Sequence, residues 1–215
     1  SVLKVTQTMP GIMVVLCEGK KRQGFQICAQ CGTGSYVKPK PKKVAEPHKD
    51  PYDRSCNGTM HTFSLAHQFE TDIVQLTFMH PPATSDKLWF AYSLASALVE
   101  AAATVLEVPA SDISATVGPI TGSGLPAIIV YDNVPGGAGL VAKLEQEKIL
   151  LEVLKVATAR VEGKCGCSEE TSCYGCLRSY RNQFAHEKLT RGAVYQYLTS
   201  VLNKLETGQL AVGVT

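Results

Sequence analysis

Four cysteines lie within twelve residues in the last quarter of the 215-residue sequence, at Cys165, Cys167, Cys173 and Cys176. Spacers this short allow the backbone to wrap around one ion, and zinc takes four thiolates in a tetrahedron at about 2.3 Å from each sulfur. Gly166 and Gly175 lie between paired cysteines, where a tight turn favours a residue without a Cβ. The spacing therefore predicts a structural zinc site, which we call the knuckle. Free thiols, disulfides and an iron–sulfur cluster are the alternatives.

A second, looser set begins with Cys28-x2-Cys31 and continues with a distant His48 and Cys56. We favour His48 over His61 as the fourth ligand, because His48 lies in a polar loop and His61 lies in a candidate strand. Two zinc ions per chain are therefore expected. In structural sites all four zinc positions are filled by protein, so neither set argues for metal catalysis. Cys17 lies in an apolar strand and is expected to be a buried thiol.

The sequence contains eight cysteines but no apolar run approaching the roughly 20 residues that cross a bilayer. Its N-terminus also lacks a basic segment followed by an apolar stretch and a cleavage site. We expect a soluble cytoplasmic protein with no membrane partner, in which thiols stay reduced and clustered cysteines bind metal. The chain starts without a Met, which suggests a fragment or a processed product.

Hydrophobic periodicity predicts the α/β class, with a small N-terminal zinc-binding β subdomain followed by a mixed α/β domain. We expect that second domain to end in the four-cysteine zinc knuckle and a C-terminal helix. Pro81 and Pro82 disfavour both helix and sheet, so we place the boundary between residues 1–80 and 81–215. The expected strands span 11–17, 24–28, 61–65, 71–78, 113–117 and 126–131. The expected helices span 88–106, capped by Asp86, 140–161 and 190–205.

Charge is unevenly distributed although the net charge is only +2. Nine Lys or Arg lie between Lys20 and Arg54 against three acids, in a stretch that includes a Lys/Pro-rich loop. Basic clusters of this kind contact nucleic-acid phosphates. We therefore expect DNA contacts at Lys40, Lys42 and Lys43.

A second basic stretch follows the knuckle directly and combines cationic, amide and aromatic side chains. Such chemistry suits phosphate contacts together with stacking on Tyr180. The alternative is a solvated face that also packs on the zinc site. The residues expected to contact nucleic acid are Arg178, Arg181, Asn182, Gln183, His186, Lys188 and Arg191.

A glycine-containing turn, residues 133–139, joins the apolar strand ending at Asp132 to a predicted helix. Its N–H groups could bind an anion, or Asp132 could serve as a turn or cap residue. The turn lacks the Gly-x4-Gly-Lys pattern of a P-loop, so this chain alone is not expected to hydrolyse ATP. A hydrolase or nuclease using Asp132, with His186 as acid/base, remains the alternative. A third hypothesis is an interaction scaffold in which the Lys/Pro-rich loop binds a protein partner.

Several motifs spread over nearly the whole chain resemble the MrfA-type zinc-binding domain. They are Gly24-Phe25-x2-Cys28-x2-Cys31-Gly32, Thr71-Asp72, the helix from Trp89 to Ala97, Tyr131-Asp132-x2-Pro135-Gly136-Gly137-Ala138-Gly139, and Ser172-Cys173-Tyr174-x-Cys176-Leu177-x2-Tyr180-x-Asn182-Gln183. The four clustered cysteines match the family's zinc-binding signature. The early cysteine pair with its downstream His and Cys looks most like DrmB, the partner of the helicase DrmA in DISARM anti-phage systems.

The resemblance implies a domain that accompanies superfamily 2 DNA helicases in DNA repair or in antiviral defence. It thus implies a helicase-associated, DNA-binding accessory role beside a helicase core in the same or a partner chain. The expected partners are that core and DNA.

Overall fold

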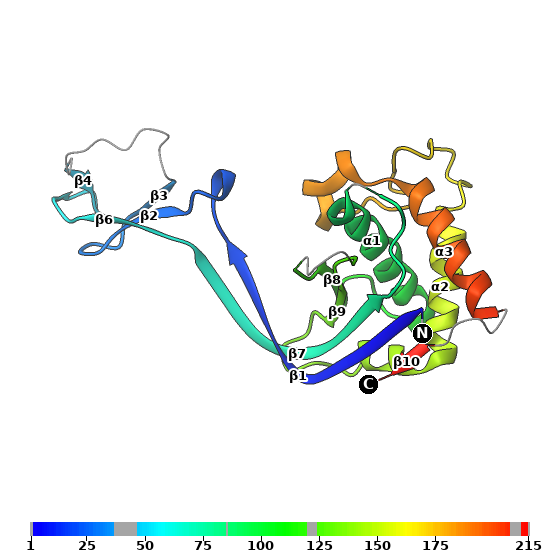
Figure 1. Cartoon of the computed structure of the whole chain (residues 1–215). Helices are drawn as coiled ribbons and strands as arrows, with labels where there is room; N and C mark the ends of the chain where they lie inside the picture. Colours follow the sequence, from blue (N-terminus) through cyan, green and yellow to red (C-terminus); the bar gives the residue numbers. More distant parts are fainter. Residues whose placement is uncertain (1, 37–46, 85, 120–123, 207–211, 215) are drawn as a thin grey trace. The chain divides into compact units, whose positions relative to one another are not determined.

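A computed structural model describes residues 2–36, 47–84, 86–119, 124–206 and 212–214. The chain divides into two compact units (Figure 1). One unit comprises residues 1–11 and 70–215, and the other comprises residues 12–69. We call them the α/β unit and the inserted unit. The mixed α/β class is confirmed. The domain boundary expected after residue 80 does not coincide with this division, and it stays a prediction.

Two long strands contribute residues to both units. β1 spans Leu3–Cys17 and β7 spans Leu65–Phe78, and the two are neighbours in one sheet. We expected three shorter strands, at 11–17, 61–65 and 71–78. The sequence carries a signal for the longer β1, because the buried Leu3 and Val5 alternate with an exposed Lys4.

The α/β unit is built on a five-stranded sheet with strand order β10-β1-β7-β9-β8. The added strands are β8 (Ile113–Val117), β9 (Ile128–Asp132) and β10 (Val212–Val214). β10 pairs parallel to β1, whereas β9 pairs antiparallel to both β7 and β8. The apolar sequence of β9 matches its central place, since Ile128 and Val130 are buried.

Three helices complete the core of this unit: α1 (Lys87–Leu106), α2 (Glu147–Val161) and α3 (Arg191–Glu206). They pack together, and α1 also contacts β8 and β9 (Figure 1). The Asp86 side chain accepts a hydrogen bond from the Trp89 N–H, as expected of a helix cap. Fully buried side chains of the core include Leu94, Leu98, Ile113, Ile128, Leu150, Leu154 and Leu198.

α1 is long and apolar enough to cross a membrane by length and composition, although we expected no such segment. In the structure it is a core helix, with eleven buried residues from Phe90 to Ala103. Its many alanines allow the neighbouring helices to approach closely.

The single helix expected over residues 140–161 is two helices, the 3₁₀ helix η2 (Val141–Glu145) and α2. Gln146 between them is extended, with φ −72° and ψ 114°. Leu144 and Leu150 are both buried, yet six residues along one α-helix place side chains about 120° apart. The break allows both leucines to reach the core.

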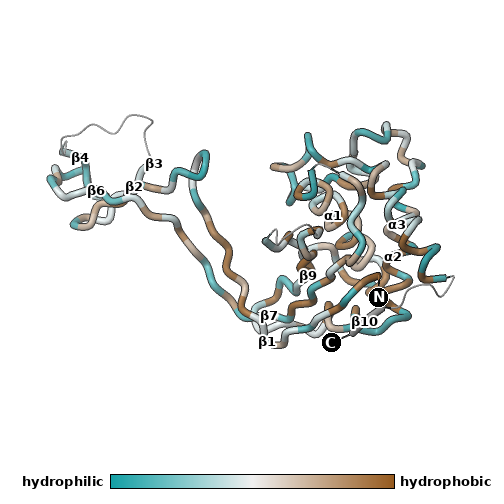
Figure 2. Tube along the Cα trace, in the orientation of Figure 1, coloured by the Kyte–Doolittle hydropathy of each residue, from teal (hydrophilic) through white to brown (hydrophobic). Residues whose placement is uncertain are grey.

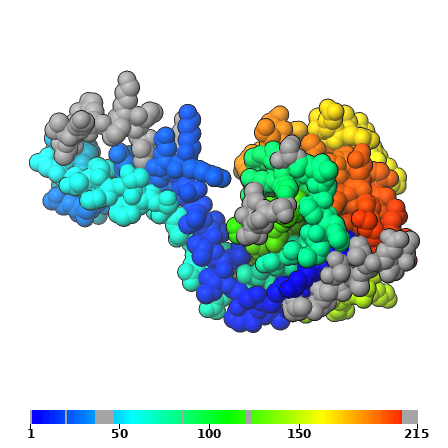
Figure 3. Space-filling model, in the orientation of Figure 1, coloured from blue at the N-terminus to red at the C-terminus, as the bar shows by residue number. Residues whose placement is uncertain are grey.

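The inserted unit holds two small antiparallel sheets. β3 (Gly34–Tyr36), β2 (Phe25–Cys28) and β6 (Met60–Phe63) form one, and β4 (His48–Lys49) pairs with β5 (Ser55–Cys56). A 3₁₀ turn, η1 (Lys20–Arg22), precedes β2. The blue and cyan surfaces of this unit lie together in Figure 3, because β2 and β6 are paired.

The inserted unit lacks a hydrophobic core over its described residues. Only Gly24, Cys28 and Cys56 are buried there. The apolar residues of β1 within this unit, coloured brown in Figure 2, are mostly exposed, among them Ile12 and Leu16. Something other than apolar burial must therefore hold these strands together.

Candidate metal centres and their surroundings

The four cysteines of the knuckle converge just after the C-terminal end of α2. Their sulfur atoms all lie within 4.8 Å of one another. The Sγ–Sγ distance is 3.5 Å for Cys165 to Cys167, 3.7 Å for Cys167 to Cys176, and 3.8 Å for Cys173 to Cys176. Four thiolates around a tetrahedral zinc ion lie about 3.8 Å apart. The geometry of the knuckle fits one zinc ion.

Local backbone turns bring these thiols together. Gly166 has φ 78°, a conformation that favours glycine. A Cβ on Gly175 would lie 3.1 Å from the Cβ of Cys165, so this position also requires a small residue. The Cys173 carbonyl accepts N–H bonds from Cys176, Leu177 and Arg178, which closes the second turn.

Two arginines donate hydrogen bonds to carbonyls of the ligand residues. Arg191 is buried, and its Nε and Nη2 donate to the Cys167 carbonyl at 3.0 and 2.8 Å. Arg160 Nε donates to the Cys176 carbonyl at 2.7 Å. Four thiolates around one Zn²⁺ leave a net charge of about −2, which these guanidinium groups offset. The same bonds fasten the knuckle to α2 and α3.

The knuckle thiols differ in acidity. The backbone N–H of Cys167 lowers the pKa of Cys165 to about 7, whereas burial raises the pKa of Cys176 to about 12. Zinc binds thiolates, so loading this site releases the protons of those cysteines that are neutral thiols in the metal-free chain.

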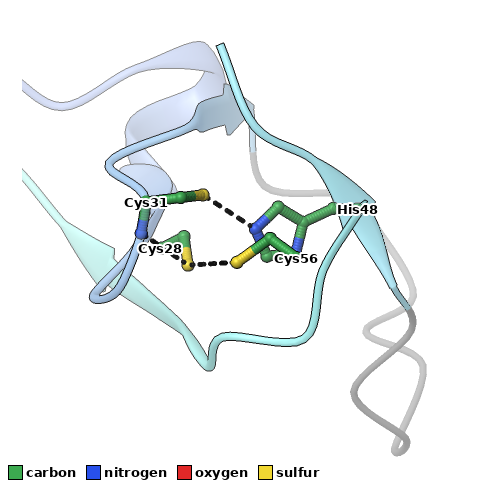
Figure 4. Close-up of side chains that lie close together, drawn as sticks. All are labelled: Cys28, Cys31, His48 and Cys56. Carbon is green, nitrogen blue, oxygen red and sulfur yellow. Dashed lines mark hydrogen bonds between the residues drawn. The ribbon is translucent and has the colours of Figure 1, made fainter. Parts of the chain in front are cut away.

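The second cluster lies in the inserted unit and unites Cys28, Cys31, His48 and Cys56 (Figure 4). Cys28 Sγ lies 3.8 Å from Cys56 Sγ, and Cys31 Sγ lies 3.2 Å from His48 Nε2. All four ligand atoms lie within 4.8 Å of one another. The structure brings His48 into this group and places His61 on β6, opposite Ile27. Together the two clusters are compatible with two zinc ions.

Separate elements position the ligands of this inserted cluster. Cys28 ends β2 and Cys31 lies in the turn between β2 and β3, while His48 and Cys56 are direct partners across β4 and β5. Asp50 organises the loop between those two strands. Its carboxylate accepts N–H bonds from Tyr52 and Arg54 at 2.9 and 2.8 Å, and these bonds lower its pKa.

Hydrogen bonds favour the thiolate form of two of the three cysteines in the inserted cluster, whereas burial helps to raise the pKa of Cys56. The Thr33 hydroxyl and backbone lower the pKa of Cys31 to about 6, and the backbone N–H of Cys31 lowers the pKa of Cys28. The Cys31 thiolate in turn raises the pKa of His48. Negative sulfur atoms gathered in this way attract a cation. Cys17, by contrast, is exposed and lies outside both clusters, so its expected burial is wrong.

The glycine turn after β9 is occupied by carboxylates of the chain itself. Asp132 is fully buried, and its carboxylate accepts N–H bonds from Ala138, Leu140 and Val141 at 2.8 to 3.1 Å. Asp72 accepts the Gly139 N–H at 2.8 Å. These N–H groups therefore have internal acceptors in place of an external anion. The geometry favours Asp132 as a cap of η2 over the nuclease hypothesis.

Three of the residues expected to contact nucleic acid bind the chain itself. Arg191 is buried against the knuckle, which removes it from any phosphate-contacting surface. Arg181 is exposed, but its guanidinium donates to the Ile113 and Ser111 carbonyls at 3.1 and 3.0 Å. Asn182 caps the 3₁₀ helix η3 (Tyr180–Lys188) and donates to the Leu177 carbonyl. These three side chains therefore hold the α/β unit together.

The other residues expected to contact DNA differ in their surroundings. His186 Nε2 lies 3.0 Å from both the Ser179 carbonyl and Asn182 Oδ1, which gives it a structural role. Arg178 is half-buried and donates to Ser172. Gln183 and Lys188 are exposed. The remaining predicted contacts, Lys40, Lys42 and Lys43, lie outside the described residues.

A mixed α/β unit that contains a four-cysteine knuckle, together with an inserted Cys3His cluster, defines a zinc-binding module. Residues 94–177 match the family model of the MrfA Zn-binding domain, so the chain contains an MrfA-type zinc-binding domain. The match includes all four cysteines of the knuckle. The inserted unit lies outside it.

Comparison with known proteins finds the chain to be 29% identical over 207 residues to the Druantia protein DruE of Escherichia coli (strain UMEA 4076-1). The match covers 83% of this chain and 11% of that protein. This relative is from Druantia, whereas the cysteine spacing suggested DISARM. The chain thus spans about a tenth of the length of this curated relative.

Two solved structures of the DUF1998 helicase MrfA are also similar. The structure bound to DNA has a TM-score of 0.47 at 13% identity and covers 91% of this chain and 25% of that chain. The structure bound to DNA and AMPPNP has a TM-score of 0.38 at 15% identity, covering 61% and 20%.

Proposed function

We propose that this chain is a zinc-stabilised accessory module of a DNA helicase, which contacts DNA and docks on a helicase core in the same or a partner polypeptide. The match to a zinc-binding domain named after MrfA supports the helicase association. The Druantia relative supports a setting in anti-phage defence, and DNA repair is the other setting that the resemblance implies. The module is an accessory to the motor and does not itself hydrolyse ATP.

The uneven distribution of charge carries the DNA part of the proposal. Residues 12–69 contain nine Lys or Arg and four acids, whereas the rest of the chain contains twelve Lys or Arg and fifteen acids. A polyanion is attracted to the inserted unit, which has a net positive charge, and is repelled by the α/β unit, which has a net negative charge. The inserted unit is therefore the better candidate for phosphate contacts than the segment after the knuckle.

The internal bonds of that segment strengthen this preference. The guanidinium groups of Arg181 and Arg191 donate hydrogen bonds to carbonyls of the α/β unit. In the inserted unit, Lys21 and Arg22 are exposed on η1, and the Arg22 side chain remains 87% exposed although it lies 3.7 Å from Glu18. Phosphate contacts need cationic groups free to approach the nucleic-acid backbone.

Exposed apolar side chains support the docking part of the proposal. Ile12, Val14 and Leu16 alternate along β1 and therefore project from one face of the strand, with exposed fractions of 50–61%. A contiguous apolar stretch of this kind marks an interaction surface. The proposed occupant is a helicase core.

Salt-dependent binding tests the DNA contact. We expect the zinc-loaded chain to bind a fluorescent DNA oligonucleotide, and log affinity to fall linearly with log salt between about 50 and 200 mM. Replacing Lys21 and Arg22 together by Glu should weaken binding and flatten the slope by about 1 to 2. Lys188→Glu, in the α/β unit, is the control and should change the DNA affinity and the salt slope less. Absence of binding at low salt, or binding indifferent to salt, would contradict the proposal.

A further inference from the structure

Three aromatic side chains lie side by side across the three-stranded sheet of the inserted unit. In the antiparallel register, Phe25 of β2 is directly opposite Tyr36 of β3 and Phe63 of β6. Directly opposite residues project from the same face of a sheet. The ring centroids of Phe25 and Tyr36 lie 5.7 Å apart. We call this row of three rings the aromatic face.

The aromatic face is open to solvent. Tyr36 is 63% exposed and Phe63 is 49% exposed, while Phe25 between them is half-buried. The next row continues the same face, with Ile27 opposite His61. These exposed rings have no core to fill, since the unit buries no large apolar side chain among its described residues.

Zinc binding uses the other face of this sheet. Side chains alternate along a strand, so Cys28 projects opposite to Phe25 and Ile27. Gln26 and its partner Thr62 share the face of Cys28. The inserted cluster therefore fixes the sheet from one side and leaves the aromatic face free.

Cationic groups flank this face. The turn containing η1 lies against Phe25, because a Cβ on Gly19 would be 3.5 Å from Phe25 Cε2. Lys21 and Arg22 on that turn are exposed. The described part of the unit contains five Lys or Arg against three acids, so a cationic excess remains although Glu18 lies 3.7 Å from Arg22. The surroundings of the rings thus favour a polyanion.

We propose that the aromatic face is a stacking platform for unpaired bases, which makes single-stranded DNA the ligand of this unit. Flat rings on adjacent strands accept the faces of successive bases, and nearby cations hold the phosphates. A duplex hides the faces of its bases and presents only their edges, so it cannot use the rings. The inference rests on the proposed DNA-binding function and narrows it to a strand type and a surface.

Single-ring variants test the platform. Tyr36→Ala and Phe63→Ala should each weaken binding of a fluorescent oligothymidylate of about 12 nucleotides by about 5- to 100-fold. Tyr36→Phe, which keeps the ring, should bind like the wild type. Phe63→Leu keeps apolar volume but removes the ring, and should bind like Phe63→Ala. Tyr52→Ala is the matched control, because Tyr52 is 79% exposed in the same unit but lies outside the aromatic face.

Two further ligands separate stacking from charge. An abasic oligonucleotide of equal length and a duplex should bind the wild type and the ring variants equally, because neither presents an unpaired base. Zinc content is measured for each variant. If an alanine variant loses metal, the comparison of Tyr36→Phe with Phe63→Leu decides the outcome.

The possible failures are distinguishable. If the ring variants bind oligothymidylate like the wild type while salt-dependent DNA binding persists, the platform is wrong and the proposed function stands. If no DNA binds the zinc-loaded chain at low salt, the proposed function fails as well. If the variants instead lose only a protein partner, the aromatic face is a protein-docking surface and the inference is overturned.

Discussion

Removing zinc is expected to unfold the inserted unit while the α/β unit keeps its core. The perturbation is a strong chelator applied to the intact chain, or Cys56→Ser, which removes one of the four ligand atoms gathered in the inserted cluster. Cys17→Ser is the matched control, because Cys17 is an exposed cysteine in the same unit that lies outside both clusters.

The magnitude follows from what the inserted unit buries. A fully buried Val, Leu, Ile, Phe or Met side chain contributes about 1.5–3 kcal/mol, and none is buried among the described residues of this unit. Zinc binding at a structural site contributes about 10–16 kcal/mol near neutral pH. Metal is therefore the main source of stability for residues 12–69. Losing one ligand should weaken zinc binding there by more than about 100-fold.

Hydrogen exchange measured by mass spectrometry checks this prediction. After chelation, amides of β2, β3 and β6 should exchange as in an unstructured chain, whereas β8, β9 and α1 should remain protected by their buried contacts. Cys56→Ser should reproduce the first effect without chelator, and Cys17→Ser should not. Persistent protection of β2 and β6 in metal-free protein would refute the reasoning.

Three further substitutions test individual contacts. Arg191→Ala should lower the melting temperature by about 6–12 °C, because it removes charged hydrogen bonds worth about 3 kcal/mol from the Cys167 and Val161 carbonyls; exposed Lys188→Ala is its control, and equal melting temperatures would count against the role. Asp132→Asn should destabilise the α/β unit by about 2 kcal/mol in denaturant titration, because an amide offers one acceptor oxygen for three N–H groups; an unchanged midpoint would restore the functional hypothesis for Asp132. Asp50→Ala should speed zinc transfer to a chromogenic chelator from the inserted cluster but not from the knuckle, because the loop that aligns His48 with Cys56 loses its N–H acceptor. Asp53→Ala, in the same loop, is the control. Unchanged transfer in Asp50→Ala would show that other contacts hold the loop.

The metal-ligating pattern is the part that sequence predicts best. Cysteine spacing encodes the knuckle because ligand and turn are neighbours in the chain, and the structure places its four thiols together. The choice of His48 over His61 rested on loop against strand character, but the structure places His48 in the short strand β4, so this reason does not hold. β6 carries His61 away from the cluster, on the face it shares with Ile27.

Long-range pairing limits what the sequence predicts elsewhere. The division between units falls inside β1 and β7, and no local signal within a strand reveals that its two ends belong to different units. The aromatic face required the register of β3, β2 and β6, which brings Phe25 beside Phe63. Arg191 was expected to contact nucleic acid but is buried. The sequence shows that this residue is basic, but it does not show that its side chain points inward.

Elemental analysis of zinc per chain tests whether each of the two clusters binds one zinc ion. We expect two zinc ions in the wild type, one in Cys173→Ser, one in Cys56→Ser, and two in Cys17→Ser, since the clusters are separate and Cys17 belongs to neither. A wild type with no zinc, or two zinc ions retained in Cys173→Ser and Cys56→Ser, would contradict this expectation.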